Sequence, residues 1–117
     1  MPSTTSYSRG DVVLVPFPFT DLSSAKHRPA LVVSADAFNA ARDDVLVAAI
    51  TSQIPATLAA DEFLIPPNAL AACGLPKPSM VRLNKLVALH RRLVIKRIGA
   101  LPATPLAQVM TQLRGLF

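Results

Sequence analysis

Short apolar runs, separated by prolines, glycines and polar residues, recur along most of the 117-residue chain. Runs of this length that are rich in Val, Leu and Ile and bounded by turn-forming residues are typical of β-strands. The stretch 79–89 alternates unevenly between apolar and polar positions, which fits one long strand or two shorter ones. The expected strands cover residues 11–17, 30–34, 45–50, about 62–65, 79–89 and 94–98.

Helical signals are confined to two short turns and one longer C-terminal segment. Asp36 is expected to cap the first turn, and Asn68 the second, which ends at Gly74. Near the C-terminus, Thr104 is expected to be an N-cap with Pro105 at the first helical position. Many strands with one terminal amphipathic helix predict a small, partly open β-barrel. The apolar face of that helix is expected to be formed by Leu106, Val109, Met110, Leu113 and Phe117.

Length and composition predict one domain over residues 10–117, preceded by a flexible polar segment over residues 1–9. No apolar run approaches the ~18 residues of a membrane span, and no signal-peptide pattern is present. Cys73 is the only cysteine, so no intrachain disulfide can form, and burial in the core is its simplest role. The two histidines and this cysteine lie far apart in the sequence, which argues against a metal site. These features predict a cytoplasmic protein without a metal or cofactor.

Charge is distributed unevenly along the chain, which has a net charge of +5 and a pI near 10.2. Residues 1–73 hold seven acidic and four basic side chains, whereas residues 74–117 hold eight basic side chains and no acidic one. Basic surface attracts polyanions at long range and makes their binding sensitive to salt. The C-terminal part therefore suits a nucleic acid or an acidic protein segment. The alternative is that these charges only keep the protein in solution.

A cationic turn precedes the second expected strand, where Lys26, His27 and Arg28 are followed by Pro29. The proline fixes its own φ and favours an extended backbone at Arg28. A guanidinium group at the end of a rigid strand can grip a phosphate or carboxylate in one geometry. From this segment alone, a surface arginine beside a loop is the simpler interpretation.

Five blocks of sequence, taken together, resemble the MazF/PemK/Kid toxins, which are the toxin halves of type II toxin–antitoxin systems. The resemblance extends from about residue 9 to residue 117, and the order and spacing of the blocks make it specific. The blocks are RGDVVLV (9–15), HRPALVVS (27–34), AITS (49–52), SMVRLN (79–84) and IGAL (98–101), followed by the terminal helix.

The resemblance implies a mainly β fold with a C-terminal helix, the SH3-like small barrel of the CcdB/Kid/PemK plasmid maintenance toxins, assembled as a homodimer. It implies a metal-independent, sequence-specific endoribonuclease that cleaves single-stranded RNA, often at short sequences, without a cofactor. In such a reaction the 2′-hydroxyl of the substrate attacks the neighbouring phosphate, which leaves a 2′,3′-cyclic phosphate and a 5′-hydroxyl end. The resemblance also implies a cognate antitoxin whose acidic tail lies across the RNA groove.

Three residues match catalytic positions of these toxins. Arg28 matches an arginine that binds the phosphate and stabilises the transition state, a task that suits the guanidinium fork. Thr51 matches a threonine whose hydroxyl can hold a phosphate oxygen or the ribose, and Ser52 beside it can add a second hydrogen bond. Arg82 matches an arginine that can protonate or stabilise the leaving 5′-oxygen, although a salt bridge at the rim of the site is its alternative role.

Position 84 departs from the family pattern. Kid-like members have an aspartate there that is suited to act as the base, whereas this chain has Asn84, which cannot accept a proton at neutral pH. His27 is then a candidate base, because histidine titrates near neutrality, although a solvated loop residue is its simpler role. Arg28 itself is the second candidate base, although a poor one, and low activity is the third outcome. His27, Ser52 and Asn84 are all expected to contact RNA.

Two other functions stay open at this stage. CcdB toxins share the implied barrel but bind DNA gyrase and have no catalytic activity, and Asn84 gives that alternative some weight. A degenerate toxin that only binds its antitoxin and helps to repress transcription is the second alternative. Phe17 and Phe19, in the connector before Arg28, are candidates for stacking on bases or for closing the end of the barrel.

Overall fold

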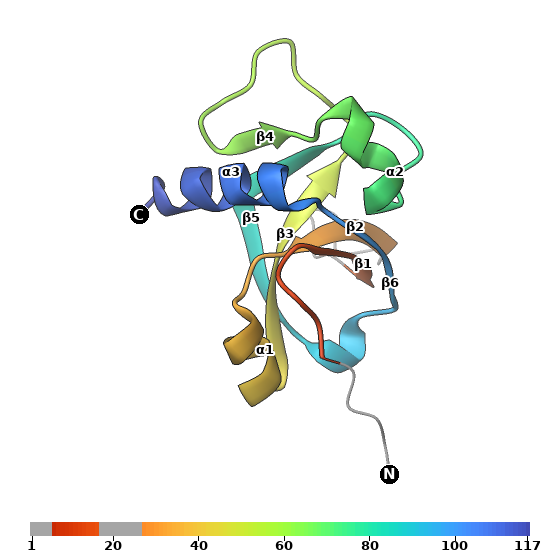
Figure 1. The fold of residues 1–117 in the computed structure, drawn as a ribbon, viewed down its shortest axis with the longest axis vertical. Helices are drawn as coiled ribbons and strands as arrows, with labels where there is room; N and C mark the ends of the chain where they lie inside the picture. The colour runs from red at the N-terminus through yellow and green to blue at the C-terminus, as the bar shows by residue number, and fades with distance from the viewer. Residues whose placement is uncertain (1–5, 17–26) are drawn as a thin grey trace.

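An antiparallel sheet curls around the interior of the protein in the computed structural model, which describes residues 6–16 and 27–117 (Figure 1). Within these residues the sheet has six strands in the order β4-β5-β3-β2-β1-β6, so β4 and β6 are its edges. This curled sheet with a C-terminal helix is the expected barrel. The strands are β1 (Asp11–Pro16), β2 (His27–Val32), β3 (Asp44–Thr51), β4 (Glu62–Leu64), β5 (Met80–His90) and β6 (Lys96–Ala100).

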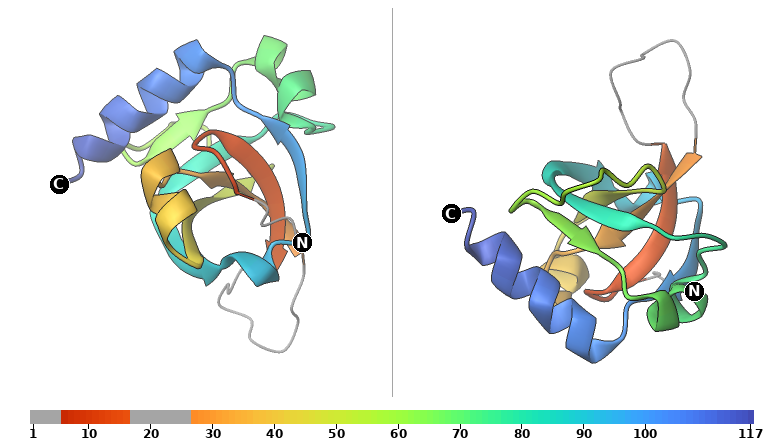
Figure 2. Two further views of the ribbon diagram at one scale, coloured as in Figure 1. Left: turned by 60° about the horizontal axis from the view of Figure 1, so that its bottom comes forward. Right: turned by 90° about the horizontal axis from the view of Figure 1, so that it is seen from above.

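The strand β5 is a single long strand, and its uneven alternation has a structural cause. Ala48 of β3 pairs with Leu86, but the next residue, Ala49, pairs with Arg82. Residues 83–85 are therefore extra on the β5 side, and an insertion of this kind bends a strand and increases its twist. A bend of this kind favours a curled sheet, and Figure 2 shows that the sheet is curled.

Strict alternation along β1, β2 and β3 divides the apolar residues between two cores. Antiparallel pairing then aligns side chains of neighbouring strands on the same face. The first core, on the side of the C-terminal helix, contains Val12, Leu31, Ala48, Ile50, Val81 and Leu83. The second core, enclosed by the curl of the sheet, contains Val13, Val15, Ala30, Val32, Val47 and Ala49.

The C-terminal helix α3 (Ala103–Arg114) crosses the first core (Figure 1). Thr104 is not its N-cap, because the helix already begins at Ala103, with Pro102 as the N-cap and the Leu106 N–H bonded to the Pro102 carbonyl. Phe117 was expected on the apolar face but lies beyond the end of the helix and is 92% exposed. The rest of the predicted face is confirmed: Leu106 is partly buried, and Val109, Met110 and Leu113 are buried.

The short helices are α1 (Asp36–Ala41), η1 (Pro67–Ala69), α2 (Leu70–Cys73) and η2 (Arg91–Leu93). Asp36 does not cap α1, because it is the first helical residue and its Oδ1 accepts the Arg9 N–H at 2.7 Å. Asn68 does not cap α2 either, since it lies inside η1. Gly74 ends α2 as predicted, with a left-handed φ of 71°.

Cys73, the last residue of α2, is fully buried in the first core, as expected, and burial raises the pKa of its thiol. The helix end approaches β6 so closely that a side chain at Gly74 would overlap the carbonyl of Ile98. Among the described residues, no helix is both long and apolar enough to cross a lipid bilayer.

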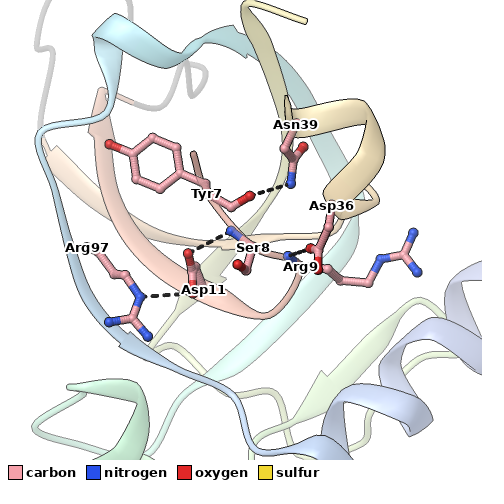
Figure 3. Close-up of polar contacts among 7 residues, drawn as sticks. All are labelled: Tyr7, Ser8, Arg9, Asp11, Asp36, Asn39 and Arg97. Atoms are coloured by element: carbon pink, nitrogen blue, oxygen red, sulfur yellow. Dashed lines mark hydrogen bonds and ion pairs between the residues drawn. The ribbon is translucent and has the colours of Figure 1, made fainter. Parts of the chain in front are cut away.

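Hydrogen bonds tie the segment before β1 to distant elements (Figure 3). The buried carboxylate of Asp11 accepts the Ser8 N–H at 2.9 Å and the Arg97 Nε–H at 2.9 Å, which links β1 to β6. The Asn39 side chain of α1 donates to the Tyr7 carbonyl at 2.9 Å. Residues 1–5 of the expected flexible segment lie outside the described residues, as do Phe17, Phe19 and most of the connector.

Candidate active site

Three polar side chains extend the second core at one end of the sheet. Alternation places Arg28 on the same face of β2 as Ala30 and Val32. The same rule places Thr51 on the face of β3 that carries Ala49. Arg82 of β5 pairs with Ala49, so it lies on this face as well. Three strands thus bring residues that are far apart in the sequence to one place, where the apolar interior gives way to polar side chains.

A cavity of about 190 Å³ lies at this place. Two guanidinium groups face it, and among the described residues no carboxylate lines it. The cavity is therefore electropositive and suited to an anion such as a phosphate group. Its lining residues are Arg28, Ile50, Thr51, Ser52, Gln53 and Arg82.

Arg82 is the more deeply placed of the two arginines. It is half-buried in a sheet position between β3 and β4, whereas Arg28 is exposed on β2. The Nε of Arg82 is buried and has no hydrogen-bond acceptor among the described residues. An unpaired buried donor is costly, and an anion that binds the same guanidinium would offset part of that cost electrostatically.

Thr51 ends β3, and a local hydrogen bond orients its side chain. Its Oγ1 accepts the Gln53 N–H at 3.1 Å, which forms a tight turn after the strand. The hydroxyl proton remains available to donate to a ligand in the cavity. The same hydrogen bond holds Ser52 and Gln53 at the rim.

Arg28 lies at the second position of β2 and faces Val15 of β1 in the antiparallel ladder. Pro29 follows it within the strand, as the sequence requires of an extended residue at this point. The guanidinium is thus carried by paired β-structure. This is the rigid support that recognition of a phosphate in one geometry demands.

Two predicted RNA-contacting residues lie outside the cavity lining. His27 is the first residue of β2, and alternation directs its side chain to the opposite face from Arg28. Asn84 is exposed within the extra segment of β5, where the pairing with β3 is interrupted. Of the expected site residues, the cavity therefore brings together Arg28, Thr51, Ser52 and Arg82, and their roles remain predictions.

Gln53 and Ile50 line the cavity but were not among the predicted site residues. The signal for Gln53 was its place directly after Thr51 and Ser52, at the end of a strand. Ile50 is buried and belongs to the first core, so the sequence predicted only that it packs in the interior. Glu62 was also missed; it pairs with Arg82 across the β4–β5 ladder and is half-buried.

The basic residues of the C-terminal part do not all present free charge. Arg97 forms an ion pair with Asp11 at 2.9 Å, and Arg91 forms one with Asp43 at 3.4 Å. Both pairs are intramolecular and reduce the positive potential near β6 and η2. Lys85 is half-buried, while Arg92 and Lys96 are exposed.

A second, apolar cavity of about 450 Å³ lies on the side of α1 and the C-terminal end of α3. Several of its residues are exposed, among them Phe38, Leu46 and Leu86. Its lining is mostly apolar, so it differs in chemistry from the cavity lined by Arg28 and Arg82, which we call the arginine cavity. The apolar lining residues are Val33, Ala35, Phe38, Leu46, Leu86, Val87, Ala88, Met110, Leu113 and Phe117.

The amino-acid sequence of this chain is similar to a known protein family and to individual members of it. The family model described as PemK-like, MazF-like toxin of type II toxin–antitoxin system matches residues 8–117. Endoribonuclease MazF6 of Mycobacterium tuberculosis is 32% identical over 91 residues, which cover 77% of each chain.

Solved structures share the fold. An endoribonuclease from Mycobacterial species superposes with a TM-score of 0.75 at 18% identity, over 97% of this chain and 93% of the other. A second solved structure, of an endoribonuclease in complex with its cognate antitoxin from Mycobacterial species, gives a TM-score of 0.74 at 19% identity, over 94% and 93% of the two chains. These likenesses show that the curled sheet and its terminal helix form a known architecture.

Proposed function

The chain belongs to the PemK-like, MazF-like toxins of type II toxin–antitoxin systems, and we propose that it is a metal-independent endoribonuclease that cleaves single-stranded RNA in the cytoplasm. The observation that carries this proposal is the convergence of Arg28, Thr51 and Arg82 on one small electropositive cavity. Relatives named endoribonucleases support the reaction class.

The proposed reaction uses a nucleophile that RNA itself supplies. The 2′-oxygen attacks the adjacent phosphorus, the bond from phosphorus to the 5′-oxygen breaks, and a 2′,3′-cyclic phosphate forms. Solvent water accepts the proton of the 2′-hydroxyl and supplies one to the departing 5′-oxygen. The protein must hold these atoms in line and stabilise negative charge on the phosphate oxygens.

The lining residues suit these tasks. Arg28 would bind the non-bridging oxygens of the phosphate, where its charge becomes more favourable as negative charge develops. Thr51 and Ser52 would donate hydrogen bonds to a phosphate oxygen or to the ribose. Arg82 would stabilise the departing 5′-oxygen. Because neither His27 nor Asn84 lines the cavity, we assign the catalytic effect chiefly to alignment and charge stabilisation.

We further propose that the protein partner is an antitoxin, and that an acidic segment of it binds the electropositive cavity of Arg28 and Arg82. One of the similar solved structures is a complex with a cognate antitoxin. A negatively charged peptide would compete with RNA for the same two arginines, since both ligands bring anionic groups to one site. Inhibition by direct occupation of the cavity follows from that shared chemistry.

A homodimer is the proposed assembly. The apolar cavity beside α3 supports it, because Leu46 and Leu86 are both exposed at its edge and Phe117 is 92% exposed. An exposed apolar patch of this kind marks an interface more often than an ordinary surface. Analytical ultracentrifugation of the protein is expected to give twice the mass of one chain, and a purely monomeric species would contradict this part of the proposal.

The reaction is tested with a pair of short RNA oligonucleotides in the presence of EDTA. The cut position is first mapped on a natural RNA by primer extension, and the second oligonucleotide then carries a single 2′-deoxy substitution at the scissile nucleotide. We expect the all-RNA substrate to be cut to a 2′,3′-cyclic phosphate end and the substituted substrate to stay intact. Cleavage of both substrates, or a requirement for a divalent metal, would overturn the mechanism.

The same preparation distinguishes the other candidate functions. A gyrase-binding toxin would leave RNA intact and inhibit supercoiling by purified DNA gyrase. A protein that only represses transcription would do neither. Intact RNA in the cleavage assay would therefore reject the proposed activity, and the supercoiling assay would show which alternative replaces it.

A further inference from the structure

Gln53 is one of the residues that line the arginine cavity, beside the residues that are proposed to hold the phosphate, and its side chain carries an amide. It is exposed, and among the described residues its amide makes no hydrogen bond to the protein. A primary amide offers an acceptor oxygen and a donor nitrogen side by side. Such a group is chemically distinct from the guanidinium and hydroxyl groups that surround it.

The position of Gln53 is fixed through its backbone. Its N–H donates to Thr51 Oγ1 at 3.1 Å, so the turn that follows β3 connects the phosphate-facing hydroxyl directly to the residue that carries the amide. A ligand held by Thr51 is therefore close to the backbone of Gln53, from which the exposed side chain extends. This coupling is what a residue that reads part of the substrate requires.

The size of the cavity determines which part of the substrate lies near Gln53. At about 190 Å³ it is smaller than the ~300 Å³ at which pockets that enclose whole small molecules begin. A phosphate group fits inside, whereas the bases of the flanking nucleotides must lie at the rim. In single-stranded RNA the edges of these bases are unpaired and available for hydrogen bonds.

We propose that Gln53 is a specificity-determining residue that recognises the base of a nucleotide flanking the bound phosphate, and that this base is adenine. A glutamine amide forms a bidentate pair with the N6 and N7 atoms of adenine. Arg28 and Arg82 bind the phosphate regardless of sequence, so they cannot supply this discrimination. The inference rests on the proposed function, since it assigns a sequence preference to the same site.

The test uses a panel of RNA oligonucleotides in which each nucleotide flanking the mapped cut is changed in turn to all four bases. Specificity constants are measured for the parent, for Gln53→Ala and for Gln108→Ala, which removes an exposed glutamine from α3, outside the arginine cavity. We expect the parent to prefer adenine at one flanking position. In Gln53→Ala the ratio of specificity constants for adenine over the other bases should fall about tenfold. Gln108→Ala should keep the preference.

A switch variant and a binding assay complete the test. Gln53→Glu has only acceptor atoms and should shift the preference from adenine towards guanine, whose Watson–Crick edge offers two donors. Affinities for the same panel, with a 2′-deoxy group at the scissile nucleotide, should follow the same order. An unchanged preference in Gln53→Ala, or a parental preference for another base at both positions, would overturn the inference.

The two proposals fail in different ways. If no RNA is cut, binding of the parent and of Gln53→Ala is compared on single-stranded RNA oligonucleotides that contain or lack adenine, and a Gln53-dependent preference for adenine there would reject only the proposed cleavage. A protein that cuts the all-RNA panel, with a preference that Gln53→Ala leaves intact, would reject only the role of Gln53.

Discussion

Glu62 and Arg82 lie directly opposite each other in the β4–β5 ladder, yet no ion pair joins them. The Glu62 Oε1 accepts the Ala59 N–H at 2.8 Å, which ties the carboxylate to the loop before β4. Arg82 instead lines the cavity that it shares with Arg28 and Thr51. A carboxylate therefore lies next to the proposed phosphate site without forming an ion pair with the guanidinium that the site uses.

Replacing Glu62 is expected to strengthen RNA binding. In Glu62→Gln the amide oxygen can still accept the Ala59 N–H, while the negative charge is lost. We expect the Kd for an uncleavable oligonucleotide to fall about two- to fivefold, with a smaller effect at high salt, as for a partly exposed charge. Fluorescence anisotropy at two salt concentrations measures this, and an unchanged Kd at low salt would show that the charge does not reach the bound phosphate.

Removal of the Arg28 guanidinium is expected to lower kcat/KM by roughly 10²–10³, the usual effect of deleting a group that stabilises transition-state charge. Arg28→Lys should restore only part of the activity, because a lysine cannot form the two parallel hydrogen bonds of a guanidinium. Since Arg28 is exposed, the melting temperature should change little. Arg42→Ala, at an exposed position outside the cavity, is the matched control. Parental kcat/KM in Arg28→Ala would show that the site is wrongly assigned.

The chemical role of the Thr51 hydroxyl can be tested separately from the volume of the Thr51 side chain. Thr51→Val keeps the volume but removes both the acceptor for the Gln53 N–H and the donor to the ligand. We expect kcat to fall at least about tenfold in Thr51→Val, by the loss of one hydrogen bond to a charged group, and far less in Thr51→Ser. Single-turnover cleavage rates measure both effects. Equal rates in the two variants would argue against a role for the hydroxyl.

Tyr7 is expected to make the stability of the fold depend on alkaline pH. Burial, and secondarily the charge of Asp11, raise the pKa of Tyr7 above its usual value of 10.0. A group with a raised pKa in the folded state contributes stability below its unfolded pKa, and this contribution is lost as the pH rises through the folded value.

The free energy of unfolding should therefore decline more steeply above pH ~10 in the parent than in Tyr7→Phe, which cannot ionise. Urea unfolding of both proteins at a series of pH values isolates the tyrosine, since every other titrating group is common to them. Parallel pH curves for the two proteins would contradict the expectation.

Close contact between α2 and β6 should make Gly99 intolerant of any side chain. A Cβ at Gly99 would overlap backbone atoms of Ala72 and Cys73, which cannot move without separating the helix from the strand. We expect Gly99→Ala to lose at least about 1–3 kcal/mol of unfolding free energy, as for an overpacked site. Gly115→Ala, whose added Cβ would lie 3.3 Å from the nearest atom, the Gln112 carbonyl oxygen, should be nearly neutral in the same urea titration.

Several features of the fold were predictable because they depend on neighbouring residues only. Val, Leu and Ile runs with turn residues at their ends located every strand of the described sheet to within a few residues. Helical spacing identified the buried face of α3, from Leu106 to Leu113. Helix starts were less predictable: Thr104 and Asp36 have suitable side chains, but the helices begin where backbone partners such as the Pro102 carbonyl are available.

By itself, the sequence determined the strands, the terminal helix, the basic C-terminal part and the ordered blocks that mark the toxin family. Only the tertiary structure decided which polar residues share the cavity. The pairing of Ala49 with Arg82, three residues out of step with the pairing before it, brings Arg82 to the face that Thr51 and Arg28 occupy. Alternation within a strand is a local property, but the register between strands depends on contacts between residues that are distant in the chain.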